Sequence, residues 1–549
     1  MHEIYYVGAR PMISTPTGDD TITSNMFAST GTRDHYAATT RATLAVAAAL
    51  LALQLSPALL RPSEFVQDDS YFYLQIADNI VAGHGSTFHG ITPTNGYHPL
   101  WMAGAVAADF LASGDRELTL HLVVVIQALL ALGTALLFHR LARRIDLEYW
   151  LPGLALILCY LLGTGLYGSE AHLNALLLVA GMLSLWRALE SDRWRSWFAT
   201  GLLLGLGILS RLDNLFVAAA LCVAGALYGG WRNFSLVARR AAASASGGLL
   251  VLAPYLAFNQ LEYGHLMPIS GAIKSTFPVF DFDLDRLGAM GKLAAPFGVL
   301  ALIIGIWLDD SRRRRVLWLG LGGGVVMHAV YVAGFTDHYT FWAWYYVAGV
   351  LAAGLCAAWL PGWLAAQLAP RPVAAVVGPA VLALTLFLLA AGAGRAWLKA
   401  FNPLSLGAFV IDIPVNEYRW PEEFARWLKL NLPPGSRLFV RDWPGAIAWH
   451  SELSLLPMDG LVNDFRYNDE LLAMGAEDYL CAHNVRHFFG LLDEVGENAV
   501  LPVAAPLYRR SAGELNLRQA NIVVKVQDVV SRPADTLPFA LWRLNCPES

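Results

Sequence analysis

The chain contains repeated apolar runs that are long enough to cross a lipid bilayer. They lie at 41–60, 119–138, 149–166, 171–186, 197–210, 212–230, 242–260, 290–308, 315–334, 341–360 and 373–392. About 20 apolar helical residues span a hydrocarbon core of roughly 30 Å. Only 15% of the residues are charged, whereas soluble domains carry roughly 25%. The sequence therefore predicts a polytopic α-helical membrane protein with about eleven transmembrane helices.

Two segments decide this count. Residues 197–230 are divided into two spans, because one helix of about 34 residues would extend ~50 Å, too long for an ordinary span. Residues 98–112 are too short for a span, and we place them along the outer interface, where Trp101 is well suited.

The basic residues of the short loops predict the orientation. Arginines follow every second span, at 140–144, 187–195, 232–240, 312–315 and 371. Because positively charged loops stay in the cytoplasm, the N-terminus is expected inside and the C-terminal region outside. For a bacterial protein this means the inner, or plasma, membrane.

The composition divides the chain into three parts. Residues 1–40 form a polar N-terminal tail, expected to be flexible and cytoplasmic, and 41–394 form the transmembrane module, with a large first outer loop at 61–118. Residues 395–549 alternate helical and strand patterns, which predicts a C-terminal extracytoplasmic α/β domain. Cys481 and Cys546 lie in this domain, and they would be able to pair outside the cytoplasm, although their spacing does not prove it.

Ionisable residues gather in the predicted outer loops. The adjacent acids Asp68 and Asp69 open the stretch DDSYFYLQIADNI in the first of these loops. Charged groups at the ends of apolar helices are costly and tend to mark functional sites, so several such loops on one side predict a polar pocket at the outer membrane boundary. The other candidates for binding a substrate are Tyr71, His98, Glu170, Arg211, Asp213, His265, Lys274, Asp337 and His338.

Each candidate also has a purely structural interpretation. Asp69 would serve equally well as the N-cap of a helix that begins near Tyr71. Arg211 and Asp213 would form an ion pair within a turn, and Lys274 would be a solvated loop residue. The histidines of the first loop do not have the spacing of metal ligands, so no metal site is predicted.

The first outer loop resembles that of a known family. The paired acids are followed by Ser70 and Tyr71, then by Gly83 and Gly85, and then by NGYHPLW at 95–101. This pattern is similar to the GT-C superfamily of polytopic glycosyltransferases, which includes protein O-mannosyltransferases, lipid A aminoarabinose transferases and mycobacterial arabinofuranosyltransferases. The resemblance covers about 41–394, and the C-terminal domain in outline.

The resemblance implies an enzyme that takes a sugar from a polyprenyl-phosphate carrier at the outer face of the membrane. The acceptor would be a glycan, a lipid or a protein, and no nucleic acid is expected as a partner. Asp68 is the first candidate for the general base and Asp69 the second. Arg211 and Lys274 would hold the phosphate, while Glu170 or Asp213 would orient hydroxyl groups.

The acids are adjacent, whereas metal-dependent relatives have a spaced Asp-x-Asp. This favours a branch without a metal or other cofactor, and a divalent metal is the less favoured alternative. Two other functions remain open at this stage. One is a transporter or flippase of a lipid-linked glycan, which should show inverted repeats and broken helices, and no repeat is visible. The other is a non-catalytic membrane scaffold, which would not need acids and cations from several loops.

Overall fold

The computed structural model describes residues 30–163, 166–336, 342–368, 374–401, 420–441, 443–491, 500–505, 520–531, 539–544 and 546. Asp337 and His338, which the sequence marked as candidates, lie outside these residues, as does most of the predicted tail. The chain forms two compact units, Met1–Ala49 and Leu50–Ser549, and helix α1 (Thr30–Leu60) runs from the first into the second. Everything below concerns the second unit.

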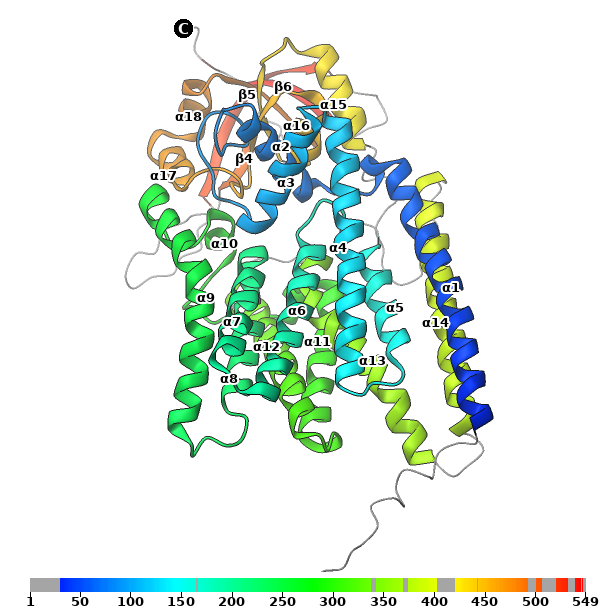
Figure 1. The fold of residues 1–549 in the computed structure, drawn as a ribbon. Coiled ribbons are helices and arrows are strands. Elements are labelled where there is room, and N and C mark those ends of the chain that lie inside the picture. The colour runs from blue at the N-terminus through cyan, green and yellow to red at the C-terminus, as the bar shows by residue number, and fades with distance from the viewer. Residues whose placement is uncertain are drawn as a thin grey trace, which may run out of the picture. The chain divides into compact units, whose positions relative to one another are not determined.

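Long apolar helices dominate the structure (Figure 1). Among the described residues, eight helices are long and apolar enough to cross a membrane. They are α1, α4 (Arg116–Arg144), α6 (Ala171–Ser191), α9 (Phe234–Tyr263), α12 (Arg312–Phe335), α13 (Val347–Leu368), α14 (Ala374–Phe401) and the continuous helical segment Leu284–Leu308, in which short helical turns flank α11 (Gly288–Ile303). The protein is thus a polytopic helical membrane protein, as predicted.

The remaining predicted runs form shorter helices. They are α5 (Trp150–Leu161), α7 (Trp194–Ser210) and α8 (Leu215–Ala226). The predicted break within 197–230 is present, because α7 ends at Ser210 and a 3₁₀ turn at Leu212–Asn214 precedes α8. The segment predicted at the interface forms α3 (Pro99–Ala112). Within the described residues each of the eleven runs contains a helix, and eight of these helical segments have the full length of a span.

Small residues let the central helices pack closely. A Cβ atom added to Gly201 of α7 would overlap the carbonyl oxygen of Ser244 in α9, and one added to Gly247 would overlap that of Phe198. Such contacts between small residues drive association in membranes, where the surrounding lipid is as apolar as the helices. The largest cluster of buried hydrophobic residues extends over several membrane helices, from α4 to α13, and contains Trp197 and Trp318.

The C-terminal region contains a mixed sheet with helices around it. Its strand order is β2-β1-β3-β6-β5-β4. The strands are β1 (Arg437–Val440), β2 (Ser454–Pro457), β3 (Val485–Leu491), β4 (Val500–Ala505), β5 (Ala520–Ser531) and β6 (Phe539–Leu544). Strand β1 is parallel to β2 and β3, and the other pairs are antiparallel.

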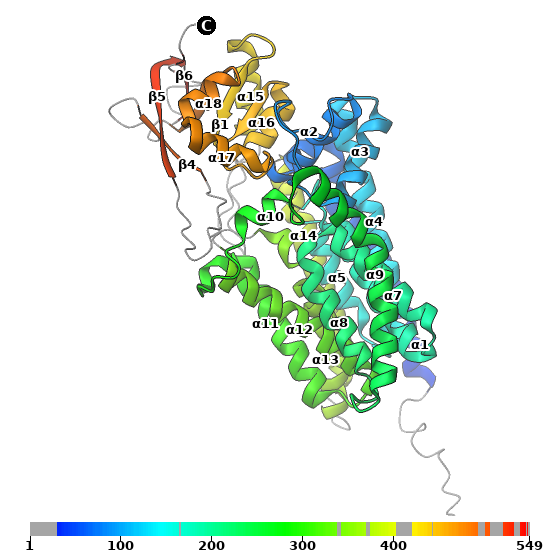
Figure 2. The same ribbon diagram turned by 90° about the vertical axis from the view of Figure 1, so that its left-hand side faces the viewer.

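The helices of this region are α15 (Trp420–Asn431), α16 (Pro444–Ser451), α17 (Phe465–Met474) and α18 (Ala476–Ala482). Cys481 and Cys546 form a disulfide. Helix α16 packs against α2 (Asp68–Val81) of the first loop, and Figures 1 and 2 both show the two helices side by side. The first loop and the C-terminal region therefore meet directly.

Candidate active site

Helix α2 places the two adjacent acids. It begins at Asp68, and its N-cap is Gln67, so both Asp68 and Asp69 lie in the first turn. The prediction that Asp69 caps a helix starting near Tyr71 is therefore wrong, because the helix begins about one turn earlier. Carboxylates are favoured in the first turn, where the helix dipole is positive. Behind them, residues 70–77 are buried and anchor the helix.

One cavity brings together residues from five separate segments of the chain. Asp69 of α2, His98, Glu170, Arg211 and Lys274 all line it. Each was predicted as a site residue from its position in an outer loop. Tyr73, Tyr97, Trp344 and Tyr345 complete much of its aromatic wall, and Leu461 and Val462 of the C-terminal region also line it.

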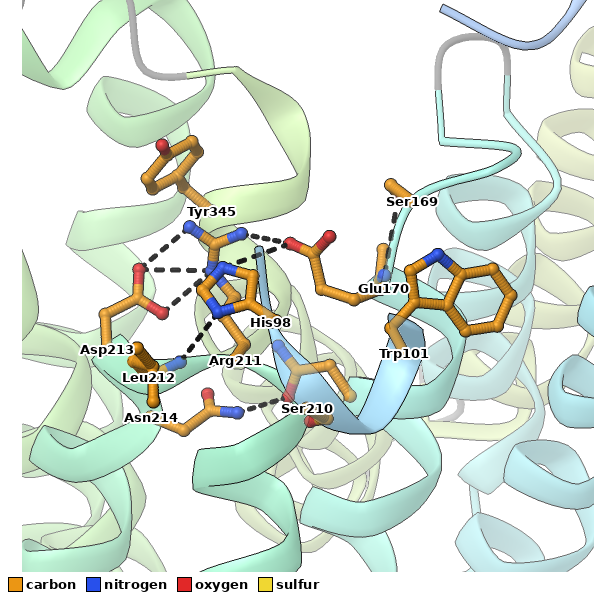
Figure 3. Close-up of polar contacts among 12 residues, drawn as sticks. His98, Trp101, Ser169, Glu170, Ser210, Arg211, Leu212, Asp213, Asn214 and Tyr345 are labelled. Carbon is orange, nitrogen blue, oxygen red and sulfur yellow. Dashed lines mark hydrogen bonds and ion pairs between the residues drawn. The ribbon is translucent and has the colours of Figure 1, made fainter. Parts of the chain in front are cut away.

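Arg211 lies at the centre of a buried ionic network (Figure 3). It is 2% exposed and sits in the non-helical backbone between α7 and α8. Its Nε lies 2.8 Å from Asp213 Oδ1, and its Nη1 donates to Glu170 Oε1. The ring of Tyr345 covers the guanidinium, with Cζ 3.8 Å from the ring centroid. Two carboxylates thus neutralise Arg211 and fix its orientation.

The partners of Arg211 are themselves held in place. Tyr73 donates a hydrogen bond from its hydroxyl to Glu170 Oε2 at 3.2 Å, and His98 Nε2 lies 4.0 Å from Glu170 Oε1. His328 Nε2 lies 3.2 Å from Asp213 Oδ2. Asp213 therefore affects the cavity indirectly, because it holds the side chain of Arg211 in place. Burial lowers the pKa of His98 to about 4, which favours the neutral imidazole.

Lys274 provides the second cation of the cavity. It ends α10 (Ile269–Lys274), and its Nζ donates a hydrogen bond to the Tyr345 hydroxyl at 2.9 Å. Burial alone would lower the pKa of Lys274, but Tyr345, Asp69 and Asp459 outweigh it and raise the pKa. The ammonium group therefore stays charged. Unlike Arg211, Lys274 is only half-buried.

Asp69 is half-buried in the same cavity. Desolvation raises the pKa of Asp69, while the positive charge of Lys274 opposes that rise. Asp459, in the turn after β2, interacts electrostatically with Asp69, and desolvation raises its pKa to about 6. A carboxylate whose pKa is raised toward neutrality is a better proton acceptor than an ordinary aspartate, provided that it is still ionised at the working pH.

Three predicted residues, besides Asp213, lie away from the cavity lining. Asp68 Oδ1 accepts a hydrogen bond from the backbone N–H of Ala446 in α16, at 2.7 Å. The Tyr71 hydroxyl lies 3.2 Å from His450 Nε2, also in α16. His265 stacks on Phe465, with ring centroids 3.9 Å apart. All three side chains thus contact the C-terminal region.

Sequence reasoning did not identify Tyr345, His328 or Asp459 as site residues. Tyr345 belongs to the aromatic run FWAWYY, in which nothing distinguishes one hydroxyl from the next. His328 lies within the apolar helix α12. An isolated histidine in an apolar helix is the sequence feature that could have identified it as a site residue. Asp459 is followed by Gly460 and resembles an ordinary turn residue. Among the described residues, no group of three His, Cys, Asp or Glu side chains is placed to hold a metal ion.

Solved structures that are similar to this chain include the following two. One is the crystal structure of ArnT from Cupriavidus metallidurans in the apo state, with 13% identity and a TM-score of 0.46, covering 85% of this chain and 96% of ArnT. The other is the arabinofuranosyltransferase AftD from Mycobacteria, with 14% identity and a TM-score of 0.38, covering 93% of this chain. This chain spans only 40% of the AftD chain.

ArnT is an aminoarabinose transferase, and both neighbours are GT-C membrane glycosyltransferases. No family model matches the sequence, and neither does any curated protein.

Proposed function

We propose that the protein is a membrane glycosyltransferase. It moves a monosaccharide from a polyprenyl-phosphate carrier to an acceptor hydroxyl of the cell envelope, with inversion at the anomeric carbon. The observation that carries this proposal is one cavity that combines the carboxylate of Asp69 with the cations of Lys274 and Arg211. Transfer from a sugar phosphate to an alcohol needs this combination, a base for the acceptor and positive charge for the leaving group.

Asp69 is the proposed general base, because it lines the cavity while Asp68 is hydrogen-bonded to α16. The acceptor hydroxyl gives its proton to the Asp69 carboxylate as its oxygen attacks the anomeric carbon. The bond between that carbon and the phosphate oxygen breaks at the same time. A phosphate is a good leaving group, so the scheme requires no strong general acid.

Lys274 is the proposed direct partner of the phosphate. Its ammonium group is half-buried and donates a hydrogen bond to the Tyr345 hydroxyl. Arg211 faces two carboxylates, so we assign it a more distant role, in which it orders Glu170 and the Tyr345 ring. Glu170 then remains available to orient a sugar or acceptor hydroxyl from the cavity wall.

The proposal is tested by measuring sugar transfer in proteoliposomes with a panel of labelled polyprenyl-phosphate sugars. Asp69→Asn should lower kcat/KM by on the order of 10²–10⁴-fold, the usual contribution of a general base. Asp478→Asn, which changes an exposed acid on α18, is the matched control and should behave as wild type. An Asp69→Asn variant with full activity would exclude the assigned base. Wild-type protein that transfers none of the panel's sugars to envelope extracts would refute the function itself.

A further inference from the structure

The two adjacent acids of α2 point to different partners. Successive residues of an α-helix lie about 100° apart around its axis, so the side chains of Asp68 and Asp69 diverge. Asp69 lines the cavity. Asp68 Oδ1 accepts the N–H of Ala446, the third residue of α16, at 2.7 Å.

Asp68 thereby does from another helix what an N-cap side chain does within one. An N-cap oxygen normally accepts the backbone N–H of the second or third helical residue. The N-cap of α16 is Trp443, and its side chain makes no capping hydrogen bond. The neighbouring Gly445 packs so closely that an added Cβ would overlap the carbonyl oxygen of Asp68. Helix α16 is therefore seated directly on the first turn of α2.

The same contact surface continues as far as the cavity. The Ser454 Oγ donates to the carbonyl of His89 at 2.6 Å, and the Thr94 Oγ1 donates to the carbonyl of Asn463 at 2.9 Å. A Cβ at Gly96 would overlap the carbonyl oxygen of Leu461. Residues 444–463 thus run along the first outer loop.

This stretch, which we call the 444–463 segment, contributes part of the cavity wall. Leu461 and Val462 line the cavity, and Gly460 lies against Ile273, the neighbour of Lys274 in α10. Helix α16 and strand β2 precede Leu461 and Val462 in the chain. The position of α16 therefore affects the position of these two residues in the cavity wall. The segment belongs to the site as much as the membrane helices do.

We propose that Asp68 is a positioning residue that fastens the 444–463 segment to the catalytic loop and so keeps Leu461 and Val462 in the wall of the active site. The proposal rests on the proposed function, in which Asp69 alone is the base. The adjacent acids then have separate tasks, one chemical and one positional.

The two tasks respond differently to the same substitution. Asn keeps an oxygen that accepts the Ala446 N–H, and Asn and Asp cap helices about equally well. Asp68→Asn should therefore keep kcat/KM within about threefold of wild type. Asp68→Ala removes the acceptor and should lower kcat/KM by on the order of 10–10²-fold, the usual effect of a small displacement of a site wall. Asp69→Asn should be nearly inactive.

Substitution of two separate glycines, one as the test and one as the control, provides an independent check that leaves both acids in place. Gly445→Ala should reproduce the loss seen in Asp68→Ala, because the new Cβ would force α16 away from Asp68. Gly394→Ala is the control, since nothing lies within 4 Å of its added Cβ. If Asp68→Asn is as inactive as Asp69→Asn, or if Asp68→Ala and Gly445→Ala are fully active, the assignment is overturned.

Hydrogen–deuterium exchange of the purified protein tests the seating without any substrate. Peptides covering 444–451 should exchange faster in Asp68→Ala and Gly445→Ala than in wild type, and at the wild-type rate in Asp68→Asn. Unchanged exchange in Asp68→Ala would refute the seating, whatever the enzyme does. Altered exchange together with a wild-type protein that transfers no sugar would instead refute the proposed function while leaving the seating intact.

Discussion

Replacing Lys274 with methionine isolates the proposed phosphate contact. The methionine keeps much of the side-chain volume but removes the charge. A hydrogen bond to a charged group contributes about 1.5–3 kcal/mol, which corresponds to roughly 10- to 150-fold in kcat/KM for the polyprenyl-phosphate sugar. The folded protein loses the bond from Nζ to the Tyr345 hydroxyl, which is worth about 1 kcal/mol, and the desolvation of the half-buried ammonium group is relieved at the same time. We therefore expect a large kinetic effect and a small change in thermal stability.

The same variant should also change the pH dependence. The charge of Lys274 lowers the pKa of Asp69, against the rise caused by burial. Without that charge the pKa of Asp69 rises further, and a smaller fraction of Asp69 is ionised at any given acidic pH. Because the ionised carboxylate is the active base, the acidic limb of the profile of kcat/KM should move to higher pH. The loss of activity is then larger at acidic pH than at alkaline pH.

The assay is initial-rate transfer in proteoliposomes across a pH series, with thermal unfolding of the same preparations. Lys292→Met is the control, because Lys292 forms an exposed ion pair with Asp285 on the surface, and such pairs contribute about 0–1 kcal/mol. A Lys274→Met enzyme that loses activity equally at every pH would refute the electrostatic link to Asp69. One that keeps wild-type kcat/KM would remove Lys274 from the phosphate site.

Three further changes test the packing around the site by thermal unfolding of the purified protein. Arg211→Ala leaves the buried Glu170 and the partly buried Asp213 without their cation and should destabilise the fold by about 3–5 kcal/mol; unchanged stability would contradict the ionic network. Gly201→Ala forces a Cβ against the Ser244 carbonyl oxygen and should cost about 1–3 kcal/mol, so a neutral effect would refute the close packing of α7 and α9. Cys546→Ser opens a disulfide that joins positions 65 apart and should cost about 4 kcal/mol relative to the oxidised wild type; a reductant should destabilise the wild type alone.

The membrane helices were predictable because length and apolarity are local properties of the chain. Each predicted run is helical, but α5, α7 and α8 are shorter than an ordinary span. An apolar sequence indicates that a helix is shielded from water. It does not indicate whether lipid or other parts of the protein surround the helix. Non-helical backbone is tolerated at membrane depth only where protein or a cavity covers it, and this covering depends on the whole fold.

The cavity was predictable in part. Glu170, Arg211 and Lys274 lie in loops that the arginine pattern placed on one side, and the structure brings them to one cavity. Their individual roles depend on distances that the pattern does not contain. The phosphate contact expected of Arg211 is an example, because Asp213 and Glu170 are ion-paired with its guanidinium. A nearby carboxylate competes with a phosphate for the same donors, and sequence spacing does not show which one wins.

The adjacent acids show how one local fact changes a functional inference. If α2 began near Tyr71, both acids would precede it, and either one would be free to cap the helix or to face a substrate. Because α2 begins at Asp68, the helix fixes an angle of about 100° between the two side chains. The partner of Asp68 is the N–H of Ala446, 378 residues further along the chain, and no local pattern announces a contact over that separation. The two side chains therefore point in different directions. Asp68 accepts the Ala446 N–H, and Asp69 lines the cavity.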